Sequence, residues 1–182
     1  MARRIPVAPR QKGFSLMELL IVVAIILIIA AIAIPNLMSA RRSANESSGA
    51  ATVRTINTAE VTYSTQYPSQ GYAVTLTTLG PNGVDCTVAA NITSTSACLI
   101  DNVLGCAAQP CIKAAFQYQL AVGGSGASAA PYPDYYVTAI GLGTGLTKKD
   151  FCSTTDAVVR WQVSTGSSTI ASATACSALN AI

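Results

Sequence analysis

An apolar run near the amino terminus is long enough to span a membrane. Leu19–Ile34 contains no polar residue. When the run is extended forward to Phe14, Glu18 is the one charged residue in it. Phe14–Ile34 comprises 21 residues, which at a helical rise of about 1.5 Å per residue gives about 31 Å. That length matches the hydrocarbon core of a bilayer. A secretory signal would have a shorter apolar region, about 7–15 residues, followed by a small-residue cleavage site. We therefore expect a membrane-spanning α-helix.

A helical pattern continues beyond this run. Apolar residues recur mainly at spacings of three or four, at Leu37, Ala40, Ala44, Ala51, Val53, Ile56, Ala59 and Tyr63. Polar residues are assigned to the other faces, namely Ser43, Asn45, Glu46, Arg54 and Glu60. Pro35 lacks a backbone N–H and should kink the helix, Gly49 should weaken it by about 1 kcal/mol, and Pro68 should end it. The pattern predicts one helix from about Phe14 to Tyr67, bent at Pro35.

From Ser69 onward the composition changes to Thr, Ser, Gly and short β-type runs. Phe116, Tyr118, Leu120 and Val122 alternate with polar or small residues, which predicts a strand with one buried face. The predicted strands are Tyr72–Leu76, Ile112–Val122, Tyr135–Ile140 and Ala157–Val163, with loops at Ser69–Asp85 and Gly123–Ser128. Several strands after one long helix predict an α+β fold, in which the helix packs on an antiparallel sheet.

The positive charge is concentrated at the amino terminus. The formal net charge is +3, but Arg3, Arg4, Arg10 and Lys12 lie in the first twelve residues without an acid. Removing these four from the eleven Lys and Arg leaves seven, against eight Asp and Glu. The basic segment should stay cytoplasmic and the body should point outward, although Arg41 and Arg42 weaken the asymmetry. The nearly neutral body predicts no specific nucleic-acid site.

The candidate chemistry is confined to cysteines. The chain has no His and six Cys, at positions Cys86, Cys98, Cys106, Cys111, Cys152 and Cys176. An even number in an exported domain indicates disulfides, whereas zinc would require CxxC pairs or Cys/His mixtures. Gly141–Leu146 contains GxG without the third Gly or a following helix, and no GxSxG or Walker loop occurs. We expect no catalytic residues, no metal and no cofactor, and therefore no enzyme.

The segment from Gly13 to Val23 resembles the type IV prepilin signature. In that family a prepilin peptidase cuts after the glycine, the new amino-terminal Phe is N-methylated, and a Glu follows as the fifth residue. These features map onto Gly13, Phe14 and Glu18. The basic leader of thirteen residues also fits, and Pro35 falls where many members carry a helix-kinking proline. The head resembles the family only loosely, by architecture and by a cysteine pair near the carboxyl terminus.

The resemblance implies a role for Glu18 in assembly. Cleavage would leave an α-ammonium on Phe14, which is expensive to bury alone in a filament core. The Glu18 carboxylate of a neighbouring subunit could neutralise it and thereby set the axial register. Two alternatives remain: pairing within one chain, which this spacing allows, and exposure of the Glu18 side chain to the lipid headgroups.

The family also suggests a disulfide pattern. A disulfide loop near the carboxyl terminus delimits an exposed region in pilins, which implies Cys152–Cys176. Cys86–Cys98 and Cys106–Cys111 are then the simplest remaining pairs, although six cysteines allow 15 connectivities.

The resemblance implies a subunit of a type IV pilus, serving adhesion, twitching motility or DNA uptake. It divides the chain into a cleaved leader (1–13), a long helix (14–67, with a membrane or filament-core part 14–34 and an amphipathic part 35–67) and an extracellular head (68–182). The implied partners are further copies of the chain in a helical homopolymer, the prepilin peptidase and the pilus assembly machinery. The subunit would lie in the inner membrane first and then in the extracellular filament.

Two other functions remain open. The first is a minor pilin or a pseudopilin of type II secretion. Major pseudopilins bind calcium through acidic loop residues near the carboxyl terminus, and here the last acids, Asp150 and Asp156, are not clustered. The second, a membrane-anchored enzyme, lacks any visible catalytic machinery.

Overall fold

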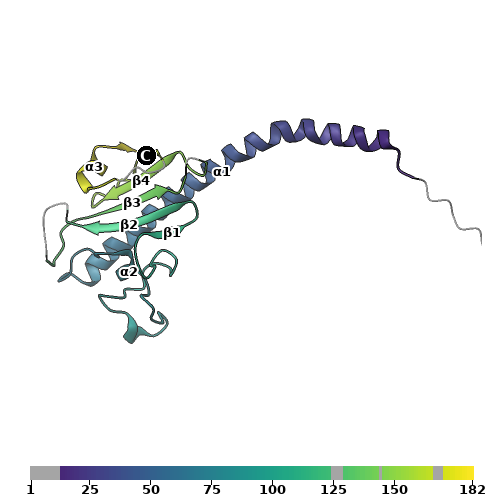
Figure 1. The fold of residues 1–182 in the computed structure, drawn as a ribbon. Coiled ribbons are helices and arrows are strands. Elements are labelled where there is room, and N and C mark those ends of the chain that lie inside the picture. Colours follow the sequence, from purple (N-terminus) through teal and green to yellow (C-terminus); the bar gives the residue numbers. More distant parts are fainter. Residues whose placement is uncertain (1–12, 124–128, 144, 166–169) are drawn as a thin grey trace, which may run out of the picture. The chain divides into compact units, whose positions relative to one another are not determined.

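The computed structural model describes residues 13–123, 129–143, 145–165 and 170–182 (Figure 1). The predicted basic leader, except for Gly13, and the predicted loop at residues 124–128 lie outside the described residues. The chain forms two compact units, Met1–Ser39 and Ala40–Ile182. The elements follow in the order α1 (Leu16–Gln66), α2 (Leu76–Leu79), the 3₁₀ turn η1 (Ala89–Asn91), β1 (Cys111–Lys113), β2 (Phe116–Val122), β3 (Tyr135–Gly141), β4 (Lys149–Thr154), β5 (Arg160–Val163), α3 (Ala173–Ser177) and β6 (Asn180–Ala181).

Helix α1 has 51 residues and its bounds agree with the predicted helix to within two residues. Its helical backbone continues through Pro35, and the bend at that residue stays a prediction. By length and composition α1 is able to cross a membrane, and no residue of its most apolar stretch is buried.

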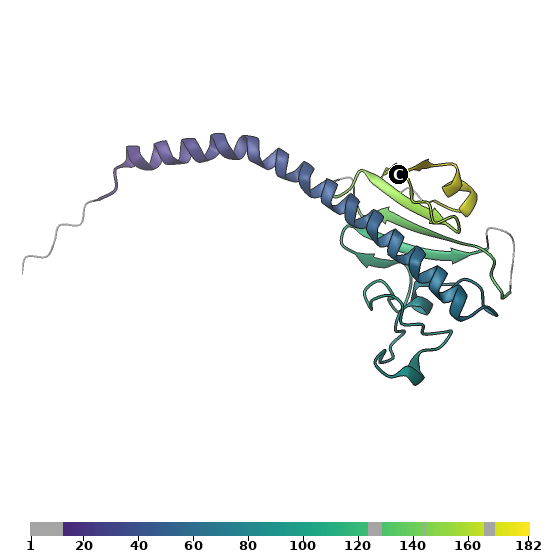
Figure 2. The same cartoon turned by 180° about the vertical axis from the view of Figure 1, so that it is seen from behind.

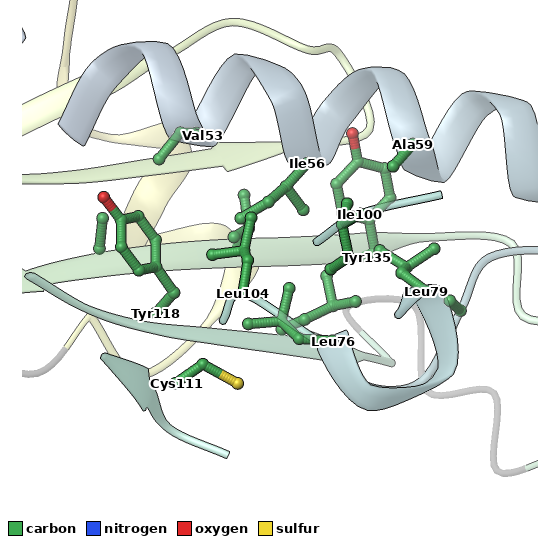
Figure 3. Packing of buried hydrophobic residues seen from close by; sticks show 14 of the residues in the cluster. Val53, Ile56, Ala59, Leu76, Leu79, Ile100, Leu104, Cys111, Tyr118 and Tyr135 are labelled. Carbon is green, nitrogen blue, oxygen red and sulfur yellow. The ribbon is translucent and has the colours of Figure 1, made fainter. Parts of the chain in front are cut away.

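The second half of α1 lies across one face of the sheet (Figure 2). Val53 and Ile56 are fully buried there, and Ala59 and Tyr63 are nearly so. Figure 3 shows Val53, Ile56 and Ala59 pointing from the helix toward the residues of the sheet and of α2. This stripe confirms the predicted apolar positions from Val53 onward, whereas Glu60, which the sequence assigned to a polar face, is buried. The earlier positions that the sequence also placed on the apolar face are exposed, namely Leu37, Ala40, Ala44 and Ala51.

The sheet is an antiparallel meander whose six strands lie side by side in chain order. Because side chains alternate along a strand, β3 serves two cores. Tyr135 and Val137 belong to the main core with α1, whereas Ile140 belongs to a smaller cluster with Cys152 and Cys176. Helix α1 and the segment around α3 therefore pack on the sheet from opposite sides. The predicted α+β fold with a long helix on an antiparallel sheet is confirmed.

The residues predicted as one strand, Ile112–Val122, form two strands. The chain turns at Ala114, which has a positive φ of 54°, and β1 and β2 pair as a hairpin. Within β2 the predicted alternation holds, since Phe116, Tyr118 and Leu120 are buried.

Two further strand predictions are corrected by local side-chain capping. The predicted strand Tyr72–Leu76 is wrong, because α2 begins at Leu76 and the Thr75 hydroxyl caps it by accepting from the Thr78 N–H at 3.3 Å. The predicted strand Ala157–Val163 begins at Arg160. Asp156 accepts the Val158 N–H at 3.0 Å and so holds the preceding residues in a turn.

Strand β4 and helix α3 were not predicted. Asp150–Thr154 is buried without interruption, because both faces of β4 are covered. A strand buried on both faces lacks the apolar–polar alternation that marks a half-exposed strand. Helix α3 spans only five residues, with Ser172 as its cap.

The structure contains three disulfides: Cys86–Cys98, Cys106–Cys111 and Cys152–Cys176. They are the pairs expected from the sequence together with the family resemblance. Cys152–Cys176 joins β4 to α3, and a crosslink of this kind stabilises the fold mainly by restricting the unfolded chain.

The disulfides lead to a chemical prediction. Thiol labelling of the denatured but unreduced protein should find no free thiol, because all six cysteines are paired. After reduction, the same labelling should modify six thiols per chain. A stoichiometric thiol before reduction, or bound zinc, would contradict this pairing.

Gly49 allows α1 to approach the sheet closely. A Cβ atom on Gly49 would lie 2.7 Å from Cε2 of Phe116, which is too close for two carbon atoms. The Phe116 ring cannot easily move away, because it is fully buried and packs on Phe151 with ring centroids 5.7 Å apart. The residue that weakens the isolated helix therefore improves its packing.

We predict that Gly49→Leu destabilises the head by about 1–3 kcal/mol through overpacking against Phe116. Thermal unfolding of the full chain in detergent, followed by near-ultraviolet circular dichroism, would measure the loss. Ala51→Leu is the matched control, because Ala51 lies two residues along the same helix and is exposed. Equal melting temperatures for the two variants would contradict the packing role of Gly49.

Candidate processing and assembly site

The predicted cleavage site precedes the first turn of α1. Gly13, Phe14 and Ser15 lie outside the helix, and all three are exposed. The Phe14 side chain is 79% exposed. The Gly13–Phe14 peptide bond thus lies in an accessible, non-helical segment beside the apolar helix, which suits a bond that a peptidase must reach.

Ser15 and Glu18 form a capping box at the start of α1. The Ser15 N–H donates to Glu18 Oε2 at 3.0 Å, and the Met17 N–H donates to Ser15 Oγ at 3.3 Å. Both donors are among the amides that have no partner within a helix. The sequence interpretation missed this role, although the Ser-x-x-Glu spacing before an apolar run is its signature.

The position of Glu18 is compatible with more than one role. A carboxylate in the first helical turn is favoured by the helix dipole, and Glu18 uses one oxygen for the amide of its own chain. The other oxygen, Oε1, makes no hydrogen bond or ion pair with the described residues. Glu18 Oε1 is therefore free to accept a hydrogen bond from an additional donor. Pairing of Glu18 with the Phe14 amine of a neighbour stays a prediction.

The apolar half of α1 presents a shallow groove to its surroundings. The groove has a volume of about 420 Å³ and is lined by Leu16, Leu19, Leu20, Val23, Ala24 and Leu27. These residues follow one another at spacings of three, one, three, one and three, so they lie along one face of the helix. Grooves of this kind accept the ridges of side chains on another helix.

The acids near the carboxyl terminus are already engaged. Asp150 is buried and accepts the Gly141 N–H at 2.8 Å. The Arg160 guanidinium donates to Asp156 and lowers the pKa of that carboxyl to about 2. Among the described residues, no group of three or more His, Cys, Asp or Glu is placed to hold a metal ion.

The chain is similar to known proteins over part of its length. Residues 8–34 match the family described as the prokaryotic N-terminal methylation motif. The type IV wide pilus major component PilA4 of Thermus thermophilus is 66% identical over 35 residues, which are 19% of this chain and 27% of that protein. The type IV major pilin protein PilA of Myxococcus xanthus is 44% identical over 55 residues, 30% of this chain and 25% of that protein.

The matched segments thus cover about a quarter of each relative. No solved structure matches the chain significantly. Residues 8–34, which match the family, contain Gly13, Phe14 and Glu18, and the helix that begins there continues into the part that packs on an antiparallel sheet. In its amino-terminal motif the chain is thus similar to type IV pilins.

Proposed function

We propose that this chain is a structural subunit of a type IV pilus rather than an enzyme. The observation that carries the proposal is the exposed apolar half of α1, directly preceded by the Gly13–Phe14 junction. Both relatives are named as major components of type IV pili. An apolar helix of this length is stable in only two surroundings, a bilayer before assembly and a layer of similar helices afterwards.

The proposed sequence of insertion, processing and assembly follows from these two surroundings. The basic leader keeps the amino terminus in the cytoplasm, and the head is exported through the inner membrane. Prepilin peptidase removes residues 1–13, and Phe14 becomes the N-methylated first residue. The assembly machinery then transfers the helix from lipid into a helical homopolymer, in which the groove along Leu16–Leu27 receives the side chains of a neighbouring copy. Adhesion, motility and DNA uptake are the roles that such a filament would serve.

Glu18 contributes to this process in two ways. In the single subunit it caps α1 through the Ser15 amide. In the filament the second oxygen of Glu18 accepts a hydrogen bond from the Phe14 ammonium of a neighbouring subunit. A buried ion left without this partner would be destabilised by several kcal/mol, and the penalty would recur at every subunit.

The processing step leads to a prediction at Gly13. Gly13→Phe should block cleavage and leave the full-length precursor in the membrane, because a bulky side chain then precedes the scissile bond. Mass spectrometry of filament protein should find a wild-type chain that starts at N-methylated Phe14. Gly143→Ala is the control, since a Cβ at Gly143 meets no other atom within 4 Å. Wild-type filament protein that begins at Met1 or beyond Pro35 would refute the proposed site.

Variants of Glu18 distinguish its role as a cap of α1 from its role as a charge that pairs with a neighbouring subunit. Glu18→Ala should be cleaved and inserted but should form few or no filaments. Glu18→Gln keeps an acceptor for the capping box but loses the charge that pairs with the ammonium, so we expect it to fail as well. Glu18→Asp should be intermediate because of its shorter reach. Electron microscopy of cell surfaces, with immunoblots of membrane fractions, measures both assembly and subunit level.

Each alternative outcome has its own meaning. If Glu18→Gln assembles normally and Glu18→Ala does not, assembly requires only the helix cap. The proposed pairing of Glu18 with the Phe14 amine of a neighbour would then be wrong. Abundant normal filaments from Glu18→Ala would reject both roles. Glu46→Gln controls for the loss of a negative charge elsewhere on the same helix, because Glu46 Oε1 accepts the Lys148 N–H and a glutamine can do the same.

A further inference from the structure

Glu60 is a buried acid in the second half of α1, where the sequence pattern predicted an exposed polar face. Its side chain is fully inaccessible to solvent. Glu60 Oε2 accepts the Ala73 N–H at 2.9 Å, whereas Oε1 has no hydrogen-bond partner among the residues that the structure describes. The Glu60 carboxyl group therefore links α1 to the segment that follows the helix through one of its two oxygens.

Among the described residues, the ionisable groups whose pKa values Glu60 affects are two tyrosines, Tyr63 on α1 itself and Tyr135 on β3. Tyr72, which precedes Ala73, packs on the ring of Tyr135. Burial raises the pKa values of Tyr63 and Tyr135, and the negative charge of Glu60 raises them further. Tyr67 and Asp156 add smaller effects on these two tyrosines. No cation compensates Glu60, because none of the ion pairs within the described ranges includes it.

The hydroxyls of Tyr63 and Tyr135, whose pKa values Glu60 raises, are directed to other acceptors. The Tyr135 hydroxyl donates to Asn57 Oδ1 at 3.1 Å, and the Tyr63 hydroxyl donates to the Ser94 carbonyl at 2.7 Å. Figure 3 shows the Tyr135 hydroxyl pointing toward α1. A carboxylate at Glu60 would thus have a single donor, the Ala73 amide, which is too little for a buried charge.

The surroundings favour the neutral acid. Burial raises the pKa of Glu60 to about 8, and the hydrogen bond from Ala73 opposes this rise only in part. In an opened chain the same carboxyl is solvated and returns to its ordinary pKa near 4.5. At a pH between these two pKa values, the Glu60 carboxyl is protonated in the closed form and ionised in the open form. Closing is thus favoured below the lower pKa, and that advantage is lost as pH rises through the higher one.

The segment held by Glu60 supports a large part of the head. Ala73 is followed by α2, and Leu76 and Leu79 of α2 are fully buried in the main core. The backbone of α2 in turn binds the chain beyond the Cys86–Cys98 loop, since the Leu99 N–H donates to the Leu79 carbonyl at 2.7 Å. Opening at Ala73 would therefore loosen α2 and the disulfide-closed loop together.

We propose that Glu60 is a proton-operated latch, which takes up a proton when the segment 70–79 docks on α1 and releases it when that segment detaches. Acid conditions hold α2 and the Cys86–Cys98 loop against the helix, and neutral to alkaline conditions progressively release them. The latch adjusts the surface of the head to the surrounding pH.

Hydrogen exchange of the full chain in detergent micelles tests the latch. Protection of the amides at residues 71–79, corrected for the intrinsic pH dependence of exchange, should fall up to about tenfold per pH unit between pH 5 and 8 and then level off. Glu60→Gln, which resembles the protonated acid and keeps an acceptor for Ala73, should give a flat profile. Glu46→Gln should retain the wild-type profile.

The same pH profile in wild type and Glu60→Gln would overturn the proposal, as would protection in the wild type that does not change with pH. If Glu60→Gln does not fold, the wild-type protein still decides the question. The carboxyl carbon of Glu60, followed by nuclear magnetic resonance on ¹³C-labelled protein, should titrate near 8 rather than near its ordinary value of 4.5. A midpoint near the ordinary value would reject the latch.

Discussion

Burial of one face of α1 against the sheet is the interaction on which the head depends. Val53 and Ile56 are removed from solvent completely, and each such side chain contributes about 1.5–3 kcal/mol. Close approach at Gly49 lets the Phe116 ring pack directly against the helix backbone. The meander itself is assembled from neighbouring strands, but only the helix closes its apolar face.

Polar contacts attach individual loops to this helix. The Arg42 Nε–H donates to the Gly145 carbonyl at 2.9 Å, and the Glu46 carboxylate accepts the Lys148 N–H at the same distance, so α1 holds the connection between β3 and β4. Deeper in the core, Asn57 donates to Ser153 Oγ at 2.9 Å. Buried bonds of this kind add little net stability, but leaving one unmade is expensive. They therefore determine where the loops dock, whereas the apolar contacts supply most of the stability.

One helix thus meets two different physical requirements. Its first half is apolar on all sides and exposed, and Glu18 at its start is satisfied locally by the Ser15 amide. Its second half is apolar on one side only, as a surface helix of a folded domain must be. The change in pattern, rather than a break in the helix, separates the exposed apolar part from the part that packs on the sheet.

The sequence alone determined the features that depend on local patterns and on strong composition signals. The 51-residue helix, the exposed apolar half, the alternation in β2 and the motif at Gly13, Phe14 and Glu18 could all be predicted, because each depends on neighbouring residues. Only the tertiary structure decided the rest. Strand β4 has no alternation because it is covered on both faces, and Glu60 is buried because the segment around Ala73 folds over it. These features arise from contacts between residues far apart in the chain, which no local pattern records.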